Sequence, residues 1–145
     1  MYTDEFYMHE ALKEAHKSFE RDEVPVGAVV VANGRIIARA FNLTETLNDV
    51  TAHAEMQAIT AAASYIGGKY LRDCTLYVTL EPCIMCAGAL YWAQIAGVVY
   101  GATDAKRGFS LCPSSLLHPA TTLRKGILEK ECAGILTEFF KKKRT

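Results

Sequence analysis

Two short motifs, His53-Ala54-Glu55 and Pro82-Cys83-Ile84-Met85-Cys86, restrict the possible folds of this chain more than any other feature. One histidine and two cysteines can supply three ligands to a zinc ion and leave the fourth position for water, whereas a structural site uses four protein ligands. Glu55 is an additional carboxylate that can take a proton from such a water. The pattern indicates an open, catalytic metal site, and it requires that two segments about thirty residues apart meet in the fold.

Each motif lies where a helix is expected to begin. We expect one helix over residues 51–65, with Asp49 or Thr51 as its N-cap and Gly67-Gly68 after its end. A second helix is expected over residues 82–95, because its first residue is a proline, which suits the first helical turn. The unpaired N–H groups and the positive dipole end of a helix start favour thiolates, the form of cysteine that binds zinc.

The spacing of His53 and Glu55 adds a geometric condition. Residues i and i+2 of a regular helix point about 200° apart, because the helix has 3.6 residues per turn. A metal that both residues approach would therefore have to lie near the end of the helix and not beside its wall.

The other segments alternate between strand and helix patterns. Apolar residues recur every three or four positions over residues 4–20, as on the buried face of a helix, and His9 and His16 fall on the expected solvent face. Asn33-Gly34 between two β-branched runs is a strong hairpin signal. The expected elements are a helix at 4–20, strands at 24–31 and 35–41, a helix at 51–65, a strand at 75–80, a helix at 82–95, a strand at 98–100, a loop at 103–122 and a helix at 128–142.

These elements predict one α/β domain over residues 1–145. The strand–helix–strand order of residues 75–100 implies a parallel pair with a right-handed crossover. Added to the antiparallel hairpin, it gives a sheet with helices on both faces. The last helix is expected to bury six residues: Leu128, Cys132, Ile135, Leu136, Phe139 and Phe140.

The composition is that of an ordinary globular chain, with 50% hydrophobic and 22% charged residues. No apolar run is long enough for a membrane span, and the acidic start at residues 1–5 does not resemble a signal peptide, so we expect a cytoplasmic protein. Five cysteines, an odd number, argue against a disulfide framework. Cys74, Cys112 and Cys132 are expected to be small buried hydrophobic residues.

The net charge is zero, but the charges are unevenly distributed. Residues 1–50 carry nine acidic and five basic side chains, whereas residues 101–145 carry four acidic and nine basic ones. Lys141, Lys142, Lys143 and Arg144 supply four of those nine. Such an end can attract a polyanion, although a solvated tail has the same composition.

The two motifs together resemble the signature of the zinc-dependent cytidine/deoxycytidylate deaminase family, H-x-E followed by P-C-x-x-C. The resemblance implies the three-layer α/β/α cytidine-deaminase-like fold, with a mixed five-stranded sheet and helices on both faces. It also implies one Zn²⁺ ion per subunit, with His53, Cys83 and Cys86 as its ligands. A zinc-activated water would attack the amino-bearing carbon, Glu55 would transfer the protons, and the backbone N–H of Ala54 would help to hold the substrate.

Longer segments resemble the bacterial tRNA-specific adenosine deaminases, which are usually homodimers and convert the anticodon wobble adenosine to inosine. The resemblance implies that Asn42 contacts the base and Asp104 the sugar region, although without it a turn asparagine and a loop aspartate would be the interpretation. The tRNA phosphates would be bound by basic side chains. The candidates for these contacts are Lys106, Arg107, Lys141, Lys142, Lys143 and Arg144. The resembling segments are 23–29, Asn42, 51–55, 76–89, 101–106 and 139–144.

Residues 90–94 depart from this pattern, because Leu90-Tyr91-Trp92-Ala93-Gln94 resembles the matching stretch of guanine deaminases. Free guanine, or another free base or nucleoside, is therefore the alternative substrate. Tyr91 and Trp92 are expected in the core or in a dimer interface. A redox Cys-x-x-Cys pair and a catalytically silent RNA-binding module with structural zinc are further alternatives. Glu55 argues against such a module, because binding alone does not require this carboxylate.

Overall fold

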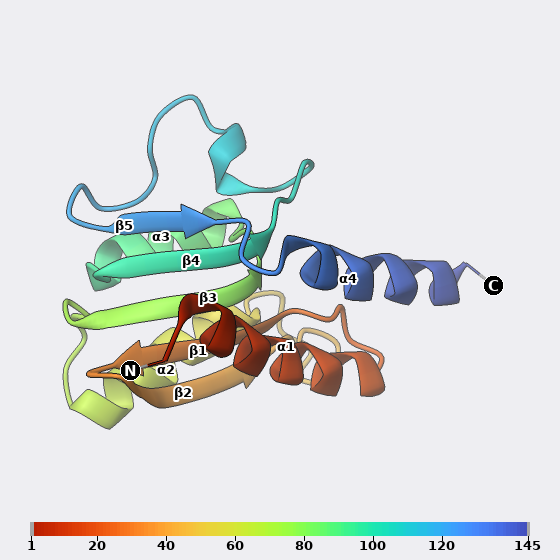
Figure 1. Cartoon of the computed structure of the whole chain (residues 1–145), viewed down its shortest axis with the longest axis horizontal. Helices are drawn as coiled ribbons and strands as arrows, with labels where there is room; N and C mark the ends of the chain where they lie inside the picture. The colour runs from red at the N-terminus through yellow and green to blue at the C-terminus, as the bar shows by residue number, and fades with distance from the viewer. Residues whose placement is uncertain (1, 145) are drawn as a thin grey trace.

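The computed structural model, which describes residues 2–144, is a five-stranded sheet with helices on both faces (Figure 1). The strand order is β2-β1-β3-β4-β5, in which β1 is antiparallel to β2 and β3, whereas β3, β4 and β5 are parallel. The three-layer α/β/α fold with a mixed sheet is confirmed. The elements are α1 (Asp4–Glu20), β1 (Gly27–Ala32), β2 (Arg35–Phe41), α2 (Ala54–Ile66), β3 (Cys74–Leu80), α3 (Ile84–Ala93), β4 (Gly97–Ala102), the 3₁₀ turn η1 (Phe109–Leu111), β5 (Thr122–Lys125) and α4 (Glu129–Lys143).

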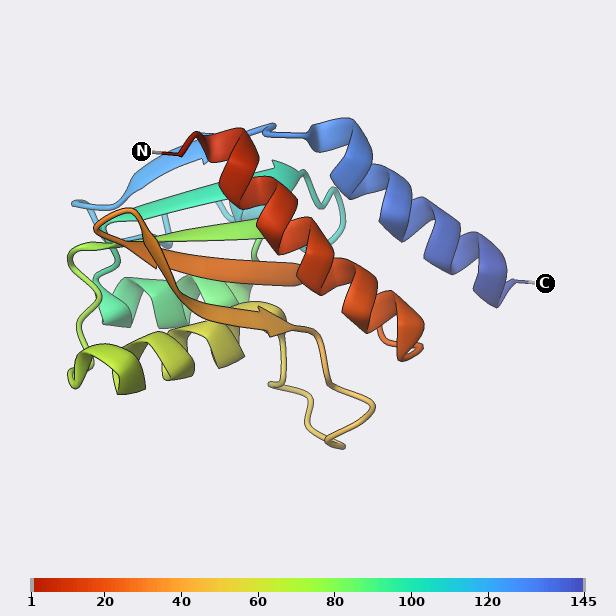
Figure 2. The same ribbon diagram turned by 60° about the horizontal axis from the view of Figure 1, so that its bottom comes forward.

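The helices cover the sheet in two layers, with α1 and α4 on one face and α2 and α3 on the other (Figure 2). Strands β1, β3 and β4 are buried on both faces, which explains their nearly continuous apolar sequences. On the face of α2, the buried helix positions are occupied by Ala54, Ala58 and Ala62, so that this helix packs closely on the strands.

Two local predictions rest on backbone conformations that the structure shows. Asn33 and Gly34 have φ angles of 51° and 73° and connect β1 to its antiparallel partner β2, as a primed hairpin turn requires. Gly67 ends α2 with a φ of 74°, the left-handed conformation that glycine adopts without steric cost. The predicted hairpin and helix end are confirmed.

Gly27, the first residue of β1, lies directly beneath α1. A Cβ atom at this position would lie 2.0 Å from the carbonyl oxygen of Ala11 and 2.4 Å from the amide nitrogen of Ala15. The backbones of β1 and α1 approach so closely that only glycine fits between them.

The predicted starts of the two motif helices were wrong by two to three residues. Helix α2 begins at Ala54, and its N-cap is His53. Asp49 does not cap the helix but accepts hydrogen bonds from the N–H and hydroxyl of Thr51, in the loop before it, at 2.8 and 2.7 Å. This local Asx turn competes with helical hydrogen bonding at residues 49–51, so the helix begins further along the chain, at Ala54.

Helix α3 begins at Ile84 after the N-cap Cys83, so Pro82 lies before the helix and not in its first turn. The backbone at Cys83 is extended, with φ −76° and ψ 176°. In both motifs the N-cap residue, His53 or Cys83, is therefore a candidate ligand. At this position the side chain does not have to project from the side of the helix.

The family resemblance implied a fifth strand, but the residue pattern did not locate it at β5, because residues up to 122 were expected to form a loop that leads into the last helix. All four residues of β5 are exposed, so it lacks the apolar alternation by which strands are recognised. It exists because β4 offers a free edge with which it pairs in parallel register.

The predicted burial was wrong at several positions. In the last helix Cys132, Ile135 and Phe139 are buried, but Phe140 is 45% exposed, because the helix meets the sheet over a narrow stripe. Tyr91 and Trp92 are exposed, which excludes the core for both side chains and leaves the dimer interface as the prediction. The remaining corrections concern three residues that are half-buried and not buried: Leu128, which occupies the N-cap position before the helix, Leu136 and Cys112.

Among the described residues, no helix combines the length and the apolar character that crossing a membrane requires.

Candidate metal centre and active site

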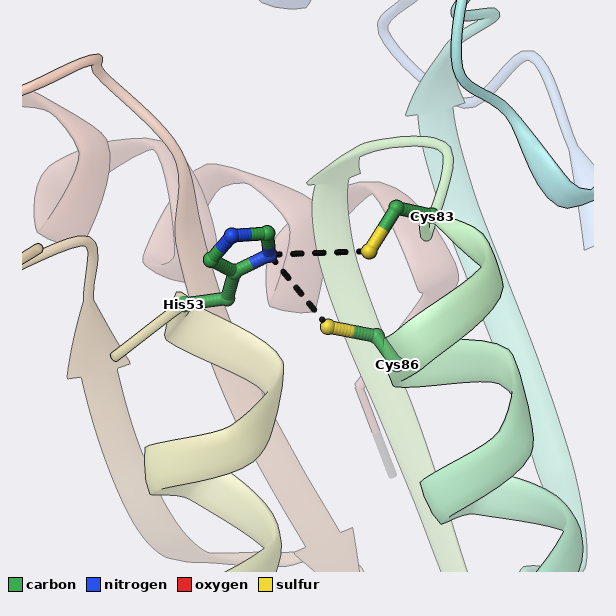
Figure 3. A group of neighbouring side chains, drawn as sticks. All are labelled: His53, Cys83 and Cys86. Carbon is green, nitrogen blue, oxygen red and sulfur yellow. Dashed lines mark hydrogen bonds between the residues drawn. The ribbon is translucent and has the colours of Figure 1, made fainter. Parts of the chain in front are cut away.

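The two motifs meet where helices α2 and α3 begin, beside the carboxyl end of β3 (Figure 3). The side chains of His53, Cys83 and Cys86 point toward one another from these two helix starts. Their ligand atoms all lie within 4.8 Å of one another. The edge at which parallel strands end is where open α/β sheets usually place their sites.

The distances within this group fit a tetrahedral zinc site. Nδ1 of His53 lies 3.6 Å from the sulfur of Cys83 and 3.5 Å from the sulfur of Cys86. A tetrahedral ion with a Zn–N bond of about 2.05 Å and Zn–S bonds of about 2.3 Å places its nitrogen and sulfur ligands about 3.6 Å apart. Three protein ligands at this spacing leave one position for a further group, as in a catalytic site.

The position of His53 outside the helix resolves the spacing problem in the first motif. His53 has extended backbone angles of φ −72° and ψ 154°, so its side chain leaves the end of α2 and not its wall. Glu55 lies in the first helical turn, one residue after the start of α2. Both side chains can therefore approach one point at the helix end, although they are only two residues apart.

The three candidate ligands share protons through hydrogen bonds. The hydrogen bond from Cys86 lowers the pKa of Cys83 to about 4, with a further contribution from the hydrogen bond to His53. The hydrogen bond to Cys83 and burial raise the pKa of Cys86, and the hydrogen bond to Cys83 raises the pKa of His53. Cys83 is therefore the thiolate of the group. Because a metal binds deprotonated cysteine and neutral histidine, metal binding would release protons from the other two side chains.

Glu55 is buried beside this group, with 4% of its surface exposed. Desolvation raises the pKa of its carboxyl group to about 7, against smaller lowering effects that include the charge of His53. A carboxyl group with a pKa near neutrality can both accept and donate a proton at physiological pH.

Two of the predicted substrate-binding residues lie on segments that adjoin the first motif. Ala54 follows His53 directly, and the N–H of Leu43, next to Asn42, donates to the carbonyl of Ala52. Ala54 is the first residue of α2, so its N–H has no carbonyl partner within the helix. Asn42 follows β2 and is buried. Its N–H donates to the carbonyl of Val26 at 3.1 Å, and its own carbonyl accepts from the hydroxyl of Ser18 at 2.9 Å. The backbone of Asn42 is therefore held on both sides.

Asp104, Lys106 and Arg107 belong to a loop that packs against the start of α3. One carboxylate oxygen of Asp104 accepts hydrogen bonds from the N–H groups of Lys106 and Arg107, each at 3.0 Å. This places Asp104 in a turn, as its alternative interpretation expected. Gly108 of the same loop forms an isolated β-bridge with Cys83, so the loop lies directly beside a candidate metal ligand.

The basic end of the chain lies on the same side of the molecule as this edge of the sheet (Figure 1). Lys143 forms an ion pair with Asp22, just beyond the end of α1. The neighbouring Arg21 stacks its guanidinium over the ring of Phe41, 5.3 Å from the centroid. Phe41 directly precedes Asn42, so contacts link the end of α4 through the end of α1 to the site.

Sequence reasoning missed two buried glutamates beside the site, Glu23 and Glu81. Glu23 precedes an apolar segment and Glu81 precedes the second motif. Both residues were recognised only within segments that resemble the tRNA-specific adenosine deaminases, and neither was given a role of its own. An acidic residue at the end of a buried strand, as at Glu81, is the signal that could have identified it, because charged side chains are buried only with partners.

Comparison with known proteins connects this geometry to a family. The model of the cytidine and deoxycytidylate deaminase zinc-binding region matches residues 1–102. A protein of Bacillus subtilis (strain 168) named tRNA-specific adenosine deaminase is 50% identical over 150 residues, which cover 99% of this chain and 92% of that protein. A solved structure from studies of A-to-I editing by tRNA:A34 deaminases at the wobble position of transfer RNA is 47% identical, with a TM-score of 0.83, and covers 90% of this chain and 99% of that chain.

The comparisons also bear on the guanine deaminase alternative. The X-ray structure of guanine deaminase from Bacillus subtilis is 41% identical but has a TM-score of 0.67 and covers 70% of this chain and 66% of that chain. This guanine deaminase structure therefore aligns with a shorter part of this chain than the tRNA:A34 deaminase structure does.

Proposed function

Because the chain belongs to the cytidine and deoxycytidylate deaminase family, we propose that it is a tRNA-specific adenosine deaminase. It hydrolyses the wobble adenosine of a tRNA anticodon to inosine and releases ammonia. The observation that carries this proposal is the buried Glu55 beside three convergent ligand side chains, in a chain that matches tRNA-specific adenosine deaminases over nearly its whole length. Because the proposed substrate is a tRNA, the proposed site of action is the cytoplasm. We also propose that a single domain over residues 1–145 carries the activity.

His53, Cys83 and Cys86 are the proposed ligands of one Zn²⁺ ion per subunit, and their donor set and spacing support this assignment. Bound zinc would lower the pKa of a water toward neutrality. Glu55 is the proposed catalytic residue. Its carboxylate would take one proton from the attacking water and deliver it to a ring nitrogen of the adenine. It would then take the remaining proton of the newly added hydroxyl group and deliver it to the departing amine, so that ammonia leaves as the carbonyl forms. Its burial, which raises its pKa to about 7, supports both roles.

Asn42, Ala54 and Asp104 are the proposed substrate-binding residues. The N–H of Ala54 has no partner within its helix and can donate to the substrate. Asn42 is buried next to the site on a backbone fixed at both of its polar groups, which favours recognition of the flipped-out base. Asp104 uses one carboxylate oxygen in its turn, and we assign the contact with the sugar region to its other oxygen.

Basic residues on both sides of the site are the proposed contacts to the RNA backbone. Lys106 and Arg107 are exposed on the loop that borders Cys83. The exposed cations at the end of α4 lie on the same side of the molecule as this loop. Phosphate contacts of this kind supply affinity without sequence readout. The proposed set is Lys106, Arg107, Lys141, Lys142, Lys143 and Arg144.

We further propose that the protein is a homodimer that pairs through the outer face of α3. Trp92 is 76% exposed, and the neighbouring Tyr91 and Ile84 are exposed as well. Large apolar side chains grouped on one helix face are typical of an interface between proteins.

The substrate assignment is tested with the purified, zinc-loaded protein and two substrates offered separately. One is an anticodon stem-loop RNA with adenosine at the wobble position, and the other is free guanine. We expect inosine in the RNA and no ammonia from guanine. Ammonia from guanine with an unchanged RNA would overturn the proposal in favour of a nucleobase deaminase.

A further inference from the structure

Two buried glutamates that are absent from the proposed catalytic set each bind a loop beside the site. Glu81 follows the end of β3, is 2% exposed and lies two residues before Cys83. Glu23 precedes β1 and is 1% exposed. Burying a carboxylate is costly unless hydrogen bonds compensate for the lost water, so the partners of these two side chains show what the burial serves.

The Glu81 carboxylate binds the loop that follows β4. One oxygen accepts the N–H of Asp104 at 3.0 Å, and the other accepts the N–H of Ser110 at 2.9 Å. Gly108 packs against the same carboxylate, because a Cβ atom on Gly108 would lie 2.3 to 2.5 Å from its three atoms. The loop is therefore wrapped around Glu81 and held at both ends.

This arrangement ties Asp104 to the metal centre through the main chain. The loop also donates the N–H of Phe109 to the carbonyl of Pro82 at 2.9 Å, and Gly108 bridges to Cys83. Glu81 and Cys83 lie on one short segment, so the carboxylate sets the position of Asp104 relative to a proposed zinc ligand.

Glu23 has the equivalent role on the other side of the site. Its carboxylate accepts the N–H of Glu45 at 3.1 Å and both the N–H and the hydroxyl of Thr46 at 2.6 Å. These residues belong to the loop between Asn42 and His53. The N–H of Leu43 donates to the carbonyl of Ala52 at 3.0 Å and closes the base of this loop.

We propose that Glu81 and Glu23 are positioning residues for the deamination, an inference that rests on the proposed function. Each carboxylate accepts at least two hydrogen bonds from one loop and so fixes the segment that contains or follows a proposed substrate-binding residue. The residue is Asp104 for Glu81 and Asn42 for Glu23. Neither glutamate touches the substrate or the reacting atoms.

The isosteric substitution Glu81→Gln tests this directly. Glutamine fills the same space against Gly108, but it replaces one acceptor oxygen by an NH₂ group that faces a backbone N–H. One of the two loop hydrogen bonds is therefore removed. We expect faster amide hydrogen exchange at Asp104 and Ser110, a KM for the stem-loop raised about 10- to 100-fold, and unchanged zinc content, because small displacements of substrate-positioning groups have effects of this size.

Two further variants separate positioning from a general loss of stability. Glu14→Gln is the matched control, because Glu14 is equally buried but pairs with Lys17 on α1, away from both loops, so we expect its KM to stay within about twofold of that of the unchanged protein. Gly108→Ala leaves Glu81 intact but pushes its carboxylate away, so it should raise KM as Glu81→Gln does.

Glu23→Gln applies the same logic to the other loop. We expect faster exchange at the amides of Glu45 and Thr46 and a raised KM, with zinc content preserved. A variant that carries both glutamine substitutions should show both exchange changes, since the two carboxylates bind different loops.

The outcomes distinguish this inference from the proposed function. Unchanged amide exchange and unchanged KM in Glu81→Gln would overturn the inference, and so would a loss of zinc, because Glu81 would then act on Cys83 and not on the loop. If the unchanged protein makes no inosine, the proposed function fails by itself, while the exchange measurements still decide whether the carboxylates hold the loops.

Discussion

Buried carboxylates occur both on helix α1 and at the site edge of the sheet, and their partners differ. On α1, Glu10 pairs with Lys13 and Arg39 at 2.7 and 2.8 Å, and Glu14 pairs with Lys17 at 2.9 Å. At the site edge, Glu81 accepts backbone N–H groups, and Glu55 lies among the candidate metal ligands.

The pKa values of Glu10 on α1 and Glu55 at the site therefore shift in opposite directions. The hydrogen bonds from Lys13 and Arg39 lower the pKa of Glu10, whereas burial raises the pKa of Glu55. A cation keeps a carboxylate charged, and a dry site makes it ready to exchange a proton. The carboxylates of Glu10 and Glu14 on α1 therefore form stabilising ion pairs, whereas the carboxyl group of Glu55 is suited to proton transfer.

Glu55→Gln should produce the largest contrast between the regions. Glutamine keeps the volume but cannot transfer protons, so we expect turnover of the stem-loop to fall by about 10²- to 10⁴-fold with zinc retained. The matched substitution Glu10→Gln on α1 should leave turnover unchanged. Inosine formation and zinc content are measured for both. Full activity in Glu55→Gln would contradict the role assigned to Glu55 and indicate another proton carrier.

Cys86→Ala tests the metal centre itself. Removal of one of three ligand side chains should lower the affinity for zinc and abolish turnover, and a moderate excess of zinc should not restore the activity. Cys132→Ala is a control, because that cysteine is equally buried but lies between α4 and the sheet. Zinc content after dialysis is the measurement, and equal content in the two variants would contradict the ligand assignment.

Gly27→Ala should affect stability and spare the chemistry. The new Cβ would overlap the backbone of α1, so we expect a loss of about 1–3 kcal/mol in the free energy of unfolding. Zinc binding per folded molecule should be unchanged, because β1 meets α1 on the face opposite the site. Urea unfolding and zinc content are compared, with Gly134→Ala, at an open position, as the control.

Charge reversal at the end of α4 should weaken RNA binding. We expect the double substitution of Lys141 and Arg144 by glutamate to lower stem-loop affinity and to reduce the slope of log Kd against log salt by about one for each phosphate that is no longer bound. Lys130→Glu, at the other end of the same helix, is the matched control. Equal salt dependence in both variants would indicate a solvated tail.

The smallest effect is expected at Asp4. The hydrogen bond from Arg124 lowers its pKa below the ordinary value of 3.8, with a further hydrogen bond from Tyr77. A carboxyl group whose pKa is lower in the folded state stabilises the fold above its unfolded pKa, and this contribution disappears as the pH falls through the folded pKa. Asp4→Asn should therefore reduce stability at pH 7, by up to about 1 kcal/mol for this partly exposed pair, and have less effect at a pH below the folded-state pKa of Asp4. Unfolding at both pH values provides the comparison, and an equal loss at both would contradict the ion-pair explanation.

Several local features of this protein, and the chemistry of its site, follow from the amino-acid sequence alone. The hairpin at Asn33-Gly34 and the end of α2 at Gly67 depend on residues within a few positions of one another. The donor set of the metal centre follows from the residue types in two short motifs. Local conformational preferences and ligand chemistry are properties of the residues themselves, so they can be predicted before the fold is known.

Other features depend on how distant segments pack together. Strand β5 exists because β4 offers it an edge, and His53 approaches the metal centre because α2 begins one residue after it. Glu81 and Asp104 are 23 residues apart, and neither shows its partner in the sequence. The physical reason is that polar groups such as the N–H and C=O groups along β4 and the carboxylate of Glu81 need hydrogen-bond partners, and where those partners lie depends on how the whole chain packs.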